Sequence, residues 1–102
     1  MKILKYELKA VAHQSIFVGT DVATPLSVAE QNGKLMLWAQ VDAGSQIVYR
    51  KCHICVRIIG TGEQYSSFAG SFPGKKDFLG TVVMSDGLVW HVFARPTYTN
   101  GK

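Results

Sequence analysis

Cys52-His53-Ile54-Cys55 is the first segment whose residue types could do chemistry, because two thiols at this spacing are typical of metal and redox sites. On a regular strand, however, residues three apart point to opposite faces, so both sulfurs cannot reach one tetrahedral ion without a bulge or turn. The other two histidines, His13 and His91, are distant in the sequence, and there is no second Cys-x-x-Cys. The pattern therefore predicts reduced cysteines with a packing role, no metal and no cofactor.

His91 is the second candidate, because Asp86 precedes it in a predicted turn and a histidine beside an acid can act as a general base. A nucleotide hydrolase would pair His91 with Asp86 or with Glu63. No serine or cysteine has a nucleophile-elbow context, and no paired carboxylates occur at a strand end. The simpler interpretation is a histidine that covers a sheet edge or hydrogen-bonds a neighbour. We assign no catalytic residue and keep the hydrolase as an alternative.

Gly60-Thr61-Gly62 resembles a fragment of a phosphate-binding loop. It lacks the lysine of a Walker loop and a following helix whose N-terminus would face an anion. It predicts a turn that ends a strand, where backbone amides can still bind a small anion.

Basic and aromatic residues recur together in the second half of the chain. Cations meet phosphates and rings stack on bases, so this pairing is typical of nucleotide or single-strand binding. The alternative is that the charges only keep an outer strand face soluble and discourage edge pairing. The candidate residues are Arg50, Lys51, Arg57, Tyr65, Phe68, Phe72, Lys75 and Lys76.

The elements that must position these residues are strands. Apolar and polar residues alternate with period two in most segments, and no run of ten or more residues has a helical period. Asn32-Gly33 predicts a type I′ turn, Ser85-Asp86-Gly87 predicts a second hairpin, and Pro25 is expected to mark a turn. Residues 63–76 form a loop with at most one short helix. We predict a mainly β fold with about six to seven antiparallel strands in hairpins, closed as a small barrel or sandwich.

Two of these strands have patterns that bear on function. In 34–42, Leu35 and alternate residues form one apolar face, while Met36 and Trp38 make the second face partly apolar as well. This predicts a central strand, or a strand whose second face meets a partner. In 46–59, one face is apolar and the other is mixed.

Composition limits the classes of protein. Hydrophobic residues make up 47% and charged residues 18% of the 102 residues, which argues against intrinsic disorder. The net charge of +4 permits an anionic partner. Lysines interrupt the apolar N-terminal residues, no apolar run is long enough for a membrane span, and two cysteines make no disulfide framework. We expect one cytoplasmic domain over residues 1–95 and a flexible tail over 96–102.

Between Met1 and Ala94 the chain resembles a family of small β-rich proteins encoded by bacteriophages and prophages. Members share a tyrosine-bearing first strand, an LWA strand, a GTG turn and a terminal VWHVF strand. Many have a histidine directly after the GTG turn, where this chain has Glu63, and the segment 46–53 is longer here. The resemblance is carried by Gln31-Asn32-Gly33-Lys34-Leu35, Leu37-Trp38-Ala39, Val41-Asp42, Arg57-Ile58-Ile59-Gly60-Thr61-Gly62, Leu79-Gly80-Thr81-Val82 and Leu88-Val89-Trp90-His91-Val92-Phe93.

The resemblance implies a phage accessory protein in the cytoplasm of the infected host. We expect a non-enzymatic binding protein that acts in counter-defence by binding a host defence protein, through an exposed β-face or the loop 63–76. One alternative is an oligomer that sequesters a nucleotide signal against Arg50, Lys51 and Arg57. Further alternatives are a nucleotide hydrolase and a nucleic-acid-binding protein. Neither a membrane partner nor a cofactor is expected.

Overall fold

The computed structural model describes residues 1–19, 22–42, 50–65 and 72–100. All strand pairs among them are antiparallel, and the one helical element is a single 3-10 turn, η1. The mainly β prediction is confirmed. The elements are β1 (Lys2–Leu8), β2 (His13–Gly19), β3 (Val22–Gln31), β4 (Lys34–Asp42), β5 (Arg50–Gly60), η1 (Lys75–Asp77), β6 (Phe78–Val83) and β7 (Val89–Asn100).

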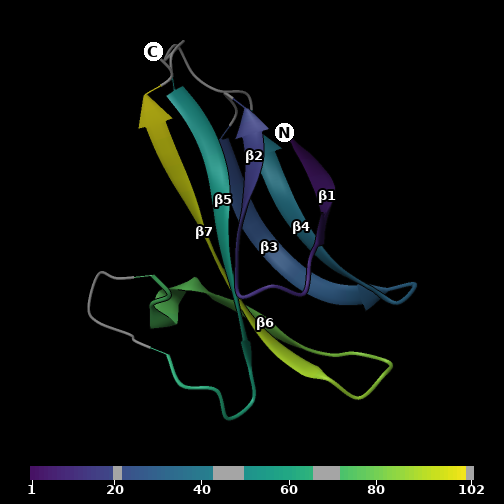
Figure 1. The fold of residues 1–102 in the computed structure, drawn as a ribbon. Helices are drawn as coiled ribbons and strands as arrows, with labels where there is room; N and C mark the ends of the chain where they lie inside the picture. The colour runs from purple at the N-terminus through teal and green to yellow at the C-terminus, as the bar shows by residue number, and fades with distance from the viewer. Residues whose placement is uncertain (20–21, 43–49, 66–71, 101–102) are drawn as a thin grey trace.

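The strands form two sheets, with the order β1-β4-β3 in one and β2-β5-β7-β6 in the other. In the described residues the two sheets do not join into a closed barrel, so the fold is the sandwich of the two predicted architectures. Figure 1 shows the long strands β5 and β7 side by side, with β6 at the end of the four-stranded sheet where β7 begins. No helix in the described part of the chain has the length and apolar character needed to cross a membrane.

The β3–β4 hairpin turns at the predicted residues. Asn32 and Gly33 both have positive φ, 54° and 79°, as a type I′ turn requires. Gln31 consequently pairs with Lys34, and this register places alternate residues of β4 on the inner face.

The core lies between the two sheets and is built mainly from β4 and β5. The predicted apolar faces of both strands are buried, and each fully buried Leu or Ile stabilises the fold by about 1.5–3 kcal/mol relative to an exposed one. The core residues of these two strands are Leu35, Leu37, Ala39, Val41, Cys52, Ile54, Val56 and Ile58.

Two expectations about proline are corrected. Pro25 does not mark a turn: it lies inside β3, beside a register irregularity between Pro25 and Ser27. Such a bulge leaves a residue outside the ladder, so a missing N–H is tolerated there. Residues 96–100 of the predicted tail are not frayed either, because β7 pairs with β5 as far as Asn100, and residues 101–102 lie outside the described part of the chain. β6 pairs with β7 only as far as Phe93. In the described residues, the part of β7 that contains Pro96 therefore has β5 as its one neighbouring strand, and proline is also tolerated at such an edge.

Candidate functional site

A pocket of about 650 Å³ lies where the turn after β5 and η1 meet the outer face of the four-stranded sheet. Of the candidate residues from the sequence, the structure brings Tyr65, Lys75 and His91 together in it, along with the Gly60–Gly62 turn. The described residues that line it are Ile59, Gly60, Thr61, Gly62, Glu63, Tyr65, Lys75, Phe78, His91 and Phe93.

In the described residues, three aromatic rings and Ile59 form the apolar part of this pocket. Phe93 of β7 is buried, with 6% of its surface exposed, while Tyr65 and Phe78 remain 44% and 49% exposed. The ring centroid of Phe93 lies 5.7 Å from that of Tyr65 and 5.3 Å from that of Phe78, both in tilted or edge-on arrangements. Large apolar side chains left this exposed beside a pocket are typical of a binding surface.

His91 lies between two threonine hydroxyls rather than beside an acid. Its Nε2 is 2.8 Å from Thr61 Oγ1 and its Nδ1 is 2.9 Å from Thr81 Oγ1. A neutral imidazole has one donor and one acceptor nitrogen, so one hydroxyl donates to the ring and the other accepts from it. Asp86 instead accepts a hydrogen bond from the Leu88 amide, 3.0 Å away. The histidine–acid pair that a hydrolase would need at His91 is therefore not formed.

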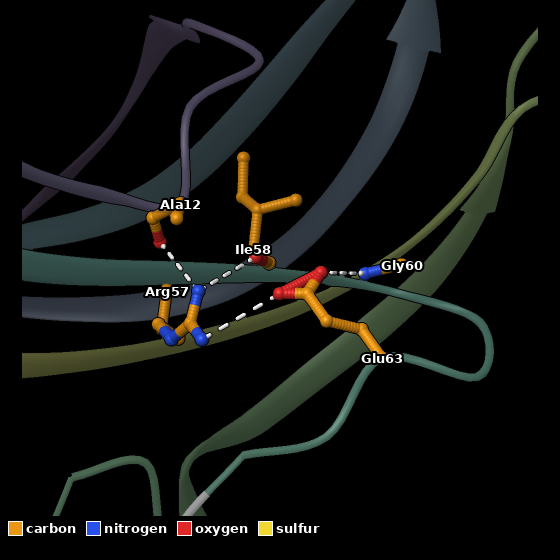
Figure 2. A network of polar contacts seen from close by, with 5 residues as sticks. All are labelled: Ala12, Arg57, Ile58, Gly60 and Glu63. Carbon is orange, nitrogen blue, oxygen red and sulfur yellow. Dashed lines mark hydrogen bonds and ion pairs between the residues drawn. The ribbon is translucent and has the colours of Figure 1, made fainter.

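The carboxylate of Glu63 folds back on the Gly60–Gly62 turn and accepts from a backbone amide that could otherwise bind a small anion. The Gly60 amide donates to Glu63 Oε1 over 3.1 Å, and Arg57 Nη2 lies 3.7 Å from Glu63 Oε2 (Figure 2). Arg57 Nη1 also donates to the carbonyl oxygens of Ala12 and Ile58, 3.3 and 3.1 Å away. The Arg57 side chain is only 12% exposed, so its charge serves the fold and neutralises Glu63.

Lys75 is the cation of the pocket. In the described parts of the chain no carboxylate forms an ion pair with it, and the sequence of residues 66–71 contains no Asp or Glu. Lys75 and its neighbour Lys76 are both exposed, but Lys76 does not line the pocket. Among the described lining residues, Lys75 is therefore a positive charge that no carboxylate neutralises.

An ion pair that the sequence analysis missed holds η1 in place. Arg95 donates to Asp77 twice, from Nη2 to Oδ2 over 2.6 Å and from Nε to Oδ1 over 3.1 Å. Asp77 is 7% exposed and also accepts a hydrogen bond from the Gly74 amide over 2.8 Å. Burial alone would raise the pKa of Asp77, but the Arg95 and Gly74 hydrogen bonds and the charges of Arg95 and Lys76 outweigh it, so the pKa lies below its usual value.

The Asp77 hydrogen bond raises the pKa of Arg95, and Arg95 Cζ lies 5.4 Å from the centre of the Phe72 ring. One sequence signal was available for Arg95: it follows His91 and Phe93 at period two in β7, which predicts the same outer face.

Other candidate residues lie away from the pocket. Met36 and Trp38 are on the outer face of the three-stranded sheet, where Met36 is only 9% exposed. Lys5 Nζ donates to Gln31 Oε1 over 2.8 Å. Because β4 lies between the strands of these two residues, this bond crosses over β4 close to Met36. That face is therefore less open to a partner than its sequence suggested.

The remaining candidates do not gather into one basic surface. Lys51 is exposed on β5, and Phe72 lies under Arg95. The side chain of Arg50 and the whole of Phe68 lie outside the described residues.

The two cysteines lie on opposite faces of β5, as the period of two along a strand predicts. Cys52 is buried in the core, and the sulfur of Cys55 lies 3.6 Å from Thr97 Oγ1 on the other face.

Comparison with known proteins gives a family but no function. A family model described as "Domain of unknown function (DUF7352)" matches residues 1–101, so the chain belongs to this family. Searches of curated proteins and of solved structures found no match.

Proposed function

We propose that this member of the DUF7352 family is a non-enzymatic binding protein, and that the pocket beside Phe93 is its contact site. The observation that carries the proposal is the exposure of Tyr65 and Phe78 on the buried ring of Phe93. Leaving both rings half in water forgoes hydrophobic stabilisation that a bound ligand or partner would restore.

Binding is better supported than hydrolysis because of how the polar groups of the pocket are used. His91 is engaged by Thr61 and Thr81, and Glu63 by Arg57 and the Gly60 amide. These contacts shape the rim of a pocket and do not arrange a general base against a reacting group.

The biological setting that we propose is that of a phage accessory protein acting in the cytoplasm of the infected host. Its role there is counter-defence, either by occupying a host defence protein or by holding a nucleotide signal. The resemblance in the LWA, GTG and VWHVF segments supports the setting, and the 650 Å³ pocket supports the small-molecule target, because cavities of roughly 300–1,000 Å³ suit ligands of that size.

The binding function is tested by thermal unfolding with neutral aromatic fragments such as indole, phenol and benzimidazole. A fragment present at about 100 times its dissociation constant stabilises the protein by roughly 2.7 kcal/mol. We expect at least one fragment to raise the melting temperature of the wild type, and we expect Tyr65→Ser with Phe78→Ser to remove that rise.

Phe17→Ser is the matched control, because Phe17 is 60% exposed and packs on His53 in another part of the same sheet. This variant should respond to fragments as the wild type does. Equal responses from the pocket variant and the wild type, or no response to any fragment, would contradict the proposed contact site.

A further inference from the structure

We propose that the pocket takes a small molecule in which a flat aromatic ring carries an anionic group, with the ring against Tyr65 and Phe78 and the anion at Lys75. A nucleoside phosphate and an aromatic carboxylate share this chemistry. The inference rests on the proposed binding function and adds the class of ligand.

The ring is inferred from the geometry of the three aromatic side chains. Tyr65 and Phe78 meet Phe93 at interplanar angles of 52° and 65°, so neither ring stacks face to face on it. Both stay nearly half exposed and line the same pocket. An added aromatic ring can stack on these surfaces without a specific pattern of hydrogen bonds, because every such ring has a π-face.

The anionic group is inferred from the balance of charge around the pocket. In the described residues, two ion pairs lie in or beside it besides Lys75: Glu63 is paired with Arg57, and Asp77 is paired with Arg95 at η1. Each of these carboxylates is neutralised within the fold. Lys75 is left as the charge that a ligand would meet, and it favours a phosphate or a carboxylate.

The backbone turn that carries Lys75 is held in position, while the Lys75 side chain itself is exposed. Lys75 is the first residue of η1, and Asp77 at the end of that turn is fixed by Arg95 and by the Gly74 amide. Arg95 lies on β7, the strand that also supplies His91 and Phe93. The backbone that carries the cation is therefore tied to the strand that carries Phe93, so less backbone ordering is left for binding to accomplish.

The test is calorimetric titration of the whole chain with AMP, adenosine and ribose 5-phosphate. We expect AMP to bind at least about tenfold more tightly than either of the other two, because only AMP presents both a ring and an anion. A parallel titration with N-acetyltryptophan and indole asks the same question of an aromatic carboxylate. A preference for the anionic member in either series supports the ligand class and identifies its source.

Lys75→Gln should bring AMP affinity down to that of adenosine and leave adenosine binding unchanged. Lys76→Gln is the matched control and should alter AMP affinity by less than about twofold, since Lys76 does not line the pocket. If neutral rings bind as tightly as their anionic counterparts in both series, the ligand class is wrong while the binding function stands. Absence of binding by every probe, or equal losses in both lysine variants, also overturns the inference.

Discussion

Arg95 on β7 and Asp77 at the end of η1 form a two-point ion pair, with nitrogen–oxygen distances of 2.6 and 3.1 Å. The two residues are 18 positions apart in the sequence, yet this contact joins the turn that carries Lys75 to the strand that carries Phe93. The position of η1 at the pocket therefore depends on a contact with the four-stranded sheet.

Breaking this pair should destabilise the protein. Asp77→Ala removes the carboxylate that accepts from the Arg95 guanidinium and from the Gly74 amide, and we expect a loss of roughly 2–3 kcal/mol in the free energy of unfolding. This lies below the figure for a fully buried pair because Arg95 is 25% exposed. Urea denaturation measures the change. Glu7→Gln, which removes an ion pair to Lys34 between side chains that are each more than half exposed, is the control and should cost less than about 0.5 kcal/mol. Similar losses in both variants would contradict the assigned role of Asp77.

Stability should depend on pH through the same carboxyl group. The pKa of Asp77 is lower in the folded protein than its ordinary value of 3.8, so its contribution is fully present above that value and is lost as the pH falls through the folded pKa. The stability difference between wild type and Asp77→Asn should therefore stay constant from pH 7 to about 5 and shrink below about pH 4. Urea midpoints measured at each pH give this difference. A stability difference that widens as the pH falls would contradict the lowered pKa of Asp77 in the folded protein.

His91 and Thr81 should be energetically coupled. Their contact of 2.9 Å joins neighbouring strands, and Thr81→Val removes the hydroxyl while keeping the shape of the side chain. We expect a double-mutant cycle with Thr81→Val and His91→Phe to give a coupling of about 1 kcal/mol. Additive effects in the cycle would mean that the hydroxyl does not bond to the ring in solution.

Neutralising Glu63 should favour an anionic ligand. Glu63→Gln keeps an oxygen that can accept from the Gly60 amide, and it removes the charge that offsets Arg57. We expect AMP to bind roughly two- to fivefold more tightly to this variant at low salt, with the gain fading as salt is added. Calorimetry at two salt concentrations checks both points. Weaker AMP binding at low salt would indicate that Glu63 itself contacts the ligand.

The features that could be predicted from the sequence are those encoded by neighbouring residues. Asn32-Gly33 determines its turn because both residues accept positive φ, and period-two alternation determined the inner faces of β4 and β5. The prediction that the folded domain ends at residue 95 is wrong, because β7 continues as far as Asn100. A strand can contain a proline such as Pro96 where it has one neighbouring strand and not two, and the number of neighbours is a tertiary property.

The candidate site was only partly predictable for the same reason. The chemical types of Tyr65, Lys75 and His91 indicate binding residues, and the fold brings all three into one pocket. The pairing of Asp77 with Arg95 and the packing of Phe78 on Phe93 depend on how a long loop returns to the sheet, which no local pattern encodes. Arg57 shows the converse: its residue type suggested ligand binding, and the fold uses it to hold Ala12, Ile58 and Glu63.

The central claim is that the surface around Phe93 is where this protein binds its ligand. A titration of the ¹⁵N-labelled whole chain with AMP, followed by amide chemical shifts, tests it most directly. We predict saturable shifts in the segment 60–63, at Lys75 and in the segment 91–93, with the amides around Phe17 unchanged. Shifts confined to the Phe17 region or to the three-stranded sheet, or no shifts with AMP, N-acetyltryptophan or indole at millimolar concentration, would contradict it.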